Sequence, residues 1–309
     1  MTRRAPVNRA QRRLARPARE RFATREVAFD AGGGTCRGAL YLPGGAATDP
    51  PAVVMGPGLG AERTAGYPAV AERFADAGYA ALLFDYPEFG DSDGDSQAIR
   101  PERQRDAYAA AVDRAQRVDV VGDELVLWGA SLSAGHVLTL AAERRDVAAV
   151  VGVVPMLDGR AIARQRGLQY LLHAGAAGGR DLLGRRFGRG RTVPIAGDTS
   201  ECAAITEPGT KRKYLDLVDR ESTWRNETPA RSLLRLARYR PVARLDEIDA
   251  PTLLLAGTDD AIVDAESVAR AGERLDRGTV VSMPADHFSV LGEDFEGAVG
   301  HQLSFLTDA

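Results

Sequence analysis

Short apolar runs that alternate with helical segments are the feature that most limits what this chain can fold into. An apolar run of roughly four to eight residues suits a strand buried on both faces, and a helix between two runs lets the strands pair in parallel. The apolar runs are PAVVM at 51–55, YAALLFDY at 79–86, ELVLW at 124–128, VAAVVGVVP at 147–155, PTLLLAG at 251–257 and TVVSM at 279–283. Helical segments are expected at 68–77, 101–117, 133–145 and 264–275. The alternation predicts an α/β fold with a mostly parallel sheet covered by helices on both faces.

The alternation is interrupted once, which divides the chain into a core and an insert. Residues 26–30 and 36–42 predict an antiparallel pair of strands at the start of the core. Between 157 and 230 the sequence holds glycines, arginines and short amphipathic pieces without a clear strand. We therefore expect a core made of residues 26–156 and 231–309, with residues 157–230 inserted as a cap.

Composition limits the classes of partner. The 309 residues are 44% hydrophobic and 27% charged, with a net charge of −3, as in ordinary soluble proteins. This balance argues against a nucleic-acid or membrane partner. Cys36 and Cys202 have neither a disulfide framework nor metal-ligand spacing, so a cytoplasmic protein without a metal or cofactor is expected. Residues 1–25 carry nine arginines and one acid, which favours a flexible basic arm over an anion-docking tail.

The segment LVLWGASLSAGHVL at 125–138 places Ser131 between an expected strand and an expected helix. A sharp strand-to-helix turn exposes a serine hydroxyl and leaves helix N-terminal amides beside it, as nucleophilic catalysis requires. The pattern is G-x-S-x-G with Ser133 in place of the last glycine. Ser133 lies beyond the apex of the turn, so Ser131 is the candidate nucleophile. The alternative is that Ser131 only caps the helix.

An acid and a base follow later strands in the order that a serine nucleophile needs. LLLAGTDDAIV ends a strand in Asp259 and Asp260, and MPADHFSV ends the next strand just before His287. A histidine takes the proton of the serine, and a carboxylate orients the histidine. Spacing alone leaves both aspartates open as the acid.

With these motifs, the chain from about residue 26 to 306 resembles an α/β-hydrolase. It is more narrowly similar to dienelactone hydrolases and Xaa-Pro dipeptidyl-peptidase-like acyl hydrolases. The resemblance implies a mostly parallel eight-stranded sheet with an inserted cap, a triad of Ser131, Asp260 and His287, and no cofactor. Asp260 is preferred to Asp259 because the family acid commonly stands three residues after the strand-closing glycine, here Gly257.

The resemblance also implies an oxyanion hole. The backbone amide of Leu132, next to the nucleophile, is its first donor. GPGLG at 56–60 resembles the family's H-G-x-G loop, so Leu59 supplies the second amide and Pro57 stands in place of the usual histidine.

Three residues are candidates for the substrate pocket, each with a structural alternative. Glu88, in a loop similar to the family's D-x-R-G-x-G-x-S segment, either faces the substrate or is solvated. His136 lies inside a helix and either packs in the interior or lines the pocket. Trp224 either packs under the cap or lines the pocket. The arginine-rich stretch 178–191 either meets an anionic part of the substrate or forms a flexible solvated loop.

Together these features predict a serine hydrolase that cleaves an ester or thioester of a small organic acyl group through an acyl-enzyme. The candidate substrates include carrier-linked and CoA-linked acyl groups, and a homodimer is one candidate assembly. Two alternatives stay open. The same triad serves acyl transfer or elimination in a biosynthetic pathway, or the scaffold binds a ligand without catalysis.

Overall fold

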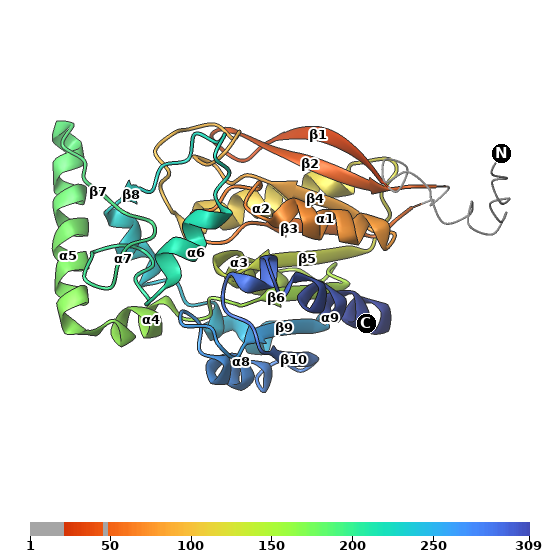
Figure 1. Ribbon diagram of the computed structural model, residues 1–309. Coiled ribbons are helices and arrows are strands. Elements are labelled where there is room, and N and C mark those ends of the chain that lie inside the picture. The colour runs from red at the N-terminus through yellow and green to blue at the C-terminus, as the bar shows by residue number, and fades with distance from the viewer. Residues whose placement is uncertain (1–21, 46–48) are drawn as a thin grey trace, which may run out of the picture.

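The computed structural model describes residues 22–45 and 49–309 (Figure 1). Its main sheet has eight strands in the order β1-β2-β4-β3-β5-β6-β9-β10. The strands are β1 Phe22–Asp30, β2 Thr35–Pro43, β3 Ala52–Gly56, β4 Ala80–Phe84, β5 Leu125–Ala130, β6 Ala149–Val153, β9 Thr252–Gly257 and β10 Gly278–Met283. β2 pairs antiparallel with β1 and with β4, and the other neighbouring strands are parallel. The expected mostly parallel eight-stranded sheet is confirmed.

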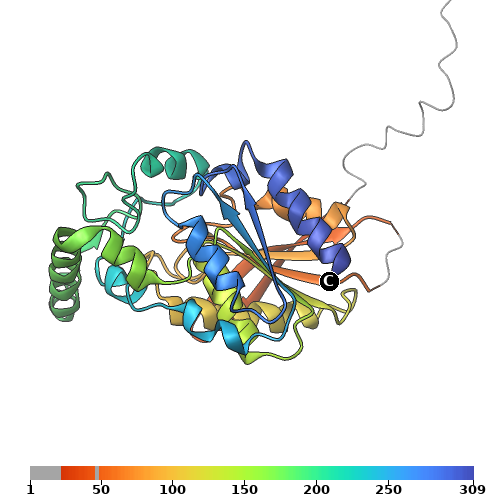
Figure 2. The ribbon, with the colours of Figure 1, turned by 90° about the horizontal axis from the view of Figure 1, so that it is seen from below.

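Helices cover both faces of the sheet because its central strands are apolar on both sides. Every residue of β3, β5, β6 and β9 is buried. One apolar layer packs under α1 (Tyr67–Asp76) and α9 (Phe295–Asp308). The other packs under three helices, as Figure 2 shows from below, namely α2 Pro101–Gln116, α3 Leu132–Glu143 and α8 Ala265–Gly272.

The insert lies between β6 and β9, at the end of the sheet opposite the C-terminus (Figure 1). Its helices are α4 Gly159–Gln165, α5 Gly167–Gly184, α6 Thr210–Leu217 and α7 Arg231–Leu236, and its two short strands are β7 Thr192–Val193 and β8 Thr228–Pro229. Short 3-10 turns occupy Arg185–Phe187, Pro241–Glu247 and, outside the insert, Ser289–Leu291. The carboxyl ends of β3, β5, β6, β9 and β10 therefore face the insert, where α/β sheets bind ligands.

The glycine- and arginine-rich stretch 178–191 differs from the expected loop, because its first seven residues belong to α5. A Cβ atom on Gly178 would lie 2.6 Å from Cγ of Leu234, so the glycine lets α7 pack closely against α5. Asp181 is fully buried and accepts hydrogen bonds from the backbone (3.0 Å) and the guanidinium (2.9 Å) of Arg231. α7, which begins just after the expected cap boundary at 230, thus packs on α5 within the segment between β6 and β9.

The N-terminal boundary also differs from expectation. Strand β1 begins at Phe22, so residues 22–25 pair with β2 and do not belong to a flexible arm. The rest of the expected basic arm, residues 1–21, lies outside the described residues. Among the helices that the structure describes, none is both long enough and apolar enough to span a bilayer.

Candidate active site

Ser131 occupies the sharp turn between β5 and α3. Its backbone has φ 53° and ψ −113°, a conformation that non-glycine residues rarely adopt. Two backbone hydrogen bonds hold it, from Ser131 N to Val153 O and from Met156 N to Ser131 O, both 2.9 Å. Gly129 lets the turn close, because a Cβ atom there would lie 2.3 Å from the carbonyl oxygen of Ser133. Ser131 makes no side-chain capping bond to α3, which removes the structural argument for a simple helix cap.

The structure brings together the serine, the histidine and one of the two candidate acids. Ser131 Oγ lies 2.9 Å from Nε2 of His287, and Nδ1 of His287 lies 2.6 Å from Oδ2 of Asp260. The other carboxylate oxygen of Asp260 accepts the backbone N–H groups of Ile262 (2.7 Å) and Val263 (2.9 Å). This carboxylate is therefore fixed to accept the Nδ1 proton, which leaves Nε2 free to accept the serine proton.

Asp259 lies outside this arrangement. Its side chain is exposed, and its backbone N–H donates to the carbonyl of Ala285 at 3.1 Å. The structure thus places Asp260, the preferred acid, against the histidine and leaves Asp259 on the surface of the same loop.

Two backbone amides near Ser131 have no hydrogen-bond acceptor in the described part of the chain. Leu132 is the first residue of α3, and the first N–H groups of a helix have no partner within it. Leu59 lies in a turn closed by the bond from Ala61 N to Gly58 O at 3.2 Å. A Cβ atom on Gly58 would lie 3.4 Å from Cβ of Ser131, so this turn approaches the serine closely. The two amides expected to form an oxyanion hole are free to do so.

Two side chains from the core hold the loop that carries Leu59. The Ser133 hydroxyl donates to the carbonyl oxygen of Pro57 and is 2.7 Å from the Tyr86 hydroxyl. The hydroxyl of Tyr67 accepts the backbone N–H of Gly58 at 2.8 Å. Ser133, where the family motif has glycine, therefore ties the elbow to the loop. No sequence motif points to the role of Tyr67.

Two side chains from the insert hold the same loop from the other side. The Tyr214 hydroxyl on α6 donates to the carbonyl oxygen of Leu59 at 2.9 Å. The indole N–H of Trp224 donates to the carbonyl of Gly60 at 2.8 Å, and Gly60 has the positive φ of 68° that such turns need. Each residue from 57 to 60 is thus held by one side chain.

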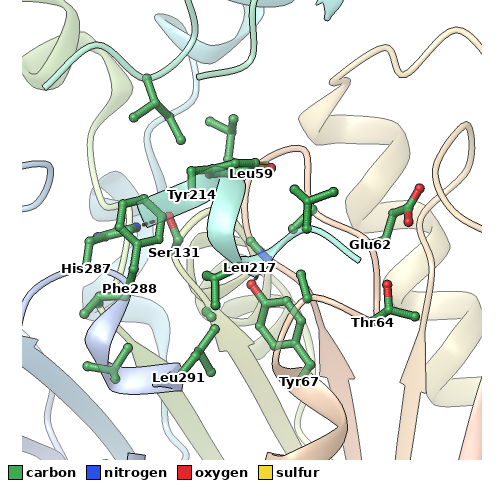
Figure 3. Close-up of a pocket in the computed structure, with 18 of the residues that line it drawn as sticks. Leu59, Glu62, Thr64, Tyr67, Ser131, Tyr214, Leu217, His287, Phe288 and Leu291 are labelled. Carbon is green, nitrogen blue, oxygen red and sulfur yellow. Dashed lines mark hydrogen bonds between the residues drawn. The ribbon is translucent and has the colours of Figure 1, made fainter. Parts of the chain in front are cut away.

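Two pockets meet at Ser131 and His287. The α6 pocket, of about 620 Å³, is lined mainly by Tyr67, Tyr214, Leu217, Trp224, Phe288, Val290 and Leu291 (Figure 3). The α5 pocket, of about 750 Å³, is lined mainly by Met156, Ile162, Ala174, Leu233, Leu236 and Ile262. Both include Leu59, Ser131, Ile205 and His287. The candidate triad therefore faces two largely apolar spaces.

Of the three expected pocket residues, only Trp224 lines a pocket that reaches Ser131. Neither alternative for Glu88 holds, because its side chain is buried outside both pockets and pairs with Arg100 (3.2 Å) and Arg103 (3.4 Å) of the α2 region. His136 is also outside both pockets.

His136 is a packing residue. Its ring is fully buried in α3, and Nδ1 lies 2.7 Å from the Tyr239 hydroxyl. Burial lowers the pKa of His136 to about 3, so the side chain is neutral at ordinary pH.

Within residues 22–45 and 49–309, no three His, Cys, Asp or Glu side chains gather as metal ligands.

Comparison with known proteins finds relatives that share this fold. A family model described as serine aminopeptidase, S33, whose members are α/β-hydrolases, matches residues 49–283. The quorum-quenching protein AidA of Acinetobacter baumannii is 31% identical over 285 residues, which cover 91% of this chain and 93% of that protein.

A second relative is the polyketide transferase ATR5 of Stachybotrys chlorohalonatus, 28% identical over 88% of this chain and 92% of its own. Among solved structures, the α/β hydrolase GrgF from Penicillium sp. sh18 superposes with a TM-score of 0.79. The match is 21% identical and covers 93% of this chain and 98% of that one, so it shows the fold. The narrower resemblance to dienelactone hydrolases stays a prediction.

Proposed function

Because the chain belongs to the α/β-hydrolase family described as serine aminopeptidase, S33, we propose that it is a serine hydrolase of organic esters or thioesters. The observation that carries the proposal is the chain of contacts from Ser131 Oγ to His287 Nε2 (2.9 Å) and from His287 Nδ1 to Asp260 Oδ2 (2.6 Å). A serine hydroxyl becomes an effective nucleophile when such a base accepts its proton.

In the proposed reaction, Ser131 Oγ attacks the scissile carbonyl carbon while its proton passes to Nε2 of His287. The carbonyl π electrons move to the oxygen, and the free N–H groups of Leu132 and Leu59 donate to this oxyanion. When the intermediate collapses, the bond to the leaving oxygen or sulfur breaks and His287 returns the proton to it. Water then repeats the sequence on the acyl-enzyme and releases the acid. Asp260 orients the imidazole throughout.

The largely apolar walls of both pockets support an organic substrate with apolar arms. A second candidate function is transfer of the acyl group to an alcohol or amine, which the second pocket at Ser131 favours because it offers space for an acceptor. The curated relatives include both thiohydrolases and polyketide transferases, which agrees with either outcome.

The test is labelling by a fluorophosphonate probe, followed by turnover of small nitrophenyl esters and matched thioesters. Wild type and Ser133→Ala should take the label and Ser131→Ala should not. Addition of an alcohol or amine separates hydrolysis from transfer, since transfer gives a new ester or amide in place of the acid. A folded wild-type protein that takes no label and turns over none of the smallest esters would favour the ligand-binding alternative.

A further inference from the structure

Two acidic side chains without a role in the proposed chemistry line the α6 pocket, buried Glu62 and exposed Asp219. Glu62 lines this pocket and is only 7% exposed. Figure 3 shows Ser131 and His287 on one side of Leu217, and Glu62 with Thr64 on the other. The nucleophile and Glu62 therefore line the same, largely apolar pocket, and Glu62 also lines the outer cleft beside it.

The burial of Glu62 is not offset by a cation. No lysine, arginine or histidine in the described residues forms an ion pair with it, in contrast to buried Asp181, which pairs with Arg231. The Ser222 hydroxyl and the Gly90 N–H lower the pKa of Glu62, but burial outweighs them and raises it. A carboxyl group held in this way is costly to the fold, which favours a role in binding.

The α5 pocket offers no comparable group. Its charged residue, Arg166, is engaged by Glu207 at 2.8 Å and by the Tyr170 hydroxyl at 2.8 Å. Tyr170 in turn donates to the carbonyl of Ala203. The two pockets therefore differ in chemistry: the polar groups of the α5 pocket bond to one another, whereas Glu62 can still accept hydrogen bonds.

We propose that Glu62 selects substrates whose arm in the α6 pocket carries a hydrogen-bond donor, a hydroxyl or an ammonium group, beyond an apolar spacer. The inference rests on the proposed function for the position of the scissile bond. A carboxylate only accepts hydrogen bonds, so it favours donors over other groups of the same size. Asp219 also lines this pocket, and its charge together with that of Glu62 disfavours an arm that ends in a carboxylate.

The test compares straight-chain esters that are matched in length and end in methyl, hydroxyl, ammonium or carboxylate groups. One series varies the acyl arm and a second varies the alcohol arm, because either arm can occupy the α6 pocket. In the series whose varied arm occupies the α6 pocket, wild type should favour the hydroxyl or the ammonium ester over the methyl ester by roughly ten-fold in kcat/KM at the best length. Comparison of the hydroxyl ester with the ammonium ester then shows which donor is preferred.

The variants are Glu62→Gln and Glu62→Leu, with Glu221→Gln as a matched control. Glu221 is exposed in the outer cleft beside Glu62 and does not line the α6 pocket. Glu62→Gln should abolish a preference for ammonium over methyl, and Glu62→Leu should abolish a preference for hydroxyl over methyl as well. Glu221→Gln should behave as wild type.

Binding measurements test the inference without turnover. Calorimetry on Ser131→Ala measures the affinity for the same esters without chemistry. Tighter binding of the hydroxyl or ammonium ester than of the methyl ester supports the inference. If the wild-type protein shows this preference in binding but turns over none of the esters, the missing turnover contradicts only the proposed function. The inference would be overturned if methyl and donor-bearing esters had equal affinities and equal rates at every length, or if carboxylates were preferred. Neither result would contradict the proposal that the protein is a hydrolase.

Discussion

The hydroxyl of Ser133 donates a hydrogen bond to the carbonyl oxygen of Pro57. This bond joins the first turn of the helix behind the nucleophile to the loop that presents Leu59. The glycine usual at position 133 has no side chain with which to make it. The departure from the G-x-S-x-G pattern therefore adds a support, at a loop whose usual histidine is also replaced.

We expect Ser133→Gly, which restores the usual motif, to lower kcat by roughly ten-fold. The reason is that one hydrogen bond to a buried carbonyl contributes about 1 kcal/mol or slightly more, and its loss frees the loop. Steady-state kinetics with a small nitrophenyl ester measure the effect, and Ser133→Ala serves as the second variant without added backbone freedom. Unchanged kcat in both variants would show that the bond does not matter for catalysis.

Tyr214→Phe tests the support from the insert. The change removes the donor to the Leu59 carbonyl but keeps the ring contacts with Trp224 and Phe288. We expect kcat to fall several-fold and KM for a small ester to change little, because the loop serves the transition state. Tyr79→Phe, which removes a hydroxyl far from the site, is the control. A fall in both variants would point to a general loss of stability.

Asp260→Asn should reduce kcat by about a thousand-fold or more, because an amide cannot hold the histidine in the tautomer that accepts the serine proton. Asp259→Asn on the same exposed loop should stay within about two-fold of wild type, since its side chain does not contact His287. Single-turnover acylation rates separate the two variants. Equal loss in both would mean that the loop rearranges when substrate binds.

The contribution of His136 to the stability of the fold should fall as pH decreases from about 6.5 toward 3. The folded protein keeps His136 unprotonated down to a pKa of about 3, whereas the unfolded chain binds a proton near 6.5. Unfolding then takes up one proton at His136, which lowers stability by at most about 1.4 kcal/mol for each unit that the pH falls. Asp85, whose pKa burial raises to about 7, acts in the opposite direction, so a His136 variant is needed to isolate this contribution.

Urea unfolding between pH 7.5 and 5 measures this dependence in wild type and in His136→Gln. The variant should be less stable at pH 7.5 but should lose less stability on acidification. His301→Gln, on the exposed side of α9, should retain the slope of wild type. If the free energy of unfolding depended on pH equally in wild type and His136→Gln, the dependence could not be assigned to His136.

The sheet could be predicted because a strand buried on both faces must be apolar throughout, and β3, β5, β6 and β9 are. Ser131 follows such a strand, β5, whereas His287 follows β10, an edge strand of which only Met283 is fully buried. Helix α5 could not be predicted in the same way. Glycine is a weak helix former, and Gly178 is helical because α7 packs against it, which is a contact between distant segments.

The places of Glu88 and Tyr214 could not be predicted for a similar reason. The sequence left open whether Glu88 faces the substrate or is solvated, because local sequence does not show that the loop turns toward Arg100 and Arg103. Tyr214 was missed because it lies 155 residues from Leu59 in the sequence. Only the folded insert brings its hydroxyl to that carbonyl.

The double attachment of the loop at residues 57–60 has a consequence for protein engineering. Two of its supports, Tyr214 and Trp224, come from the insert, so the insert does more than enclose the substrate. A chimaera that receives the cap of a relative would change substrate shape and oxyanion geometry at once. Grafts of this kind should succeed only when the donor cap brings its own hydrogen-bond donors to the carbonyls of Leu59 and Gly60.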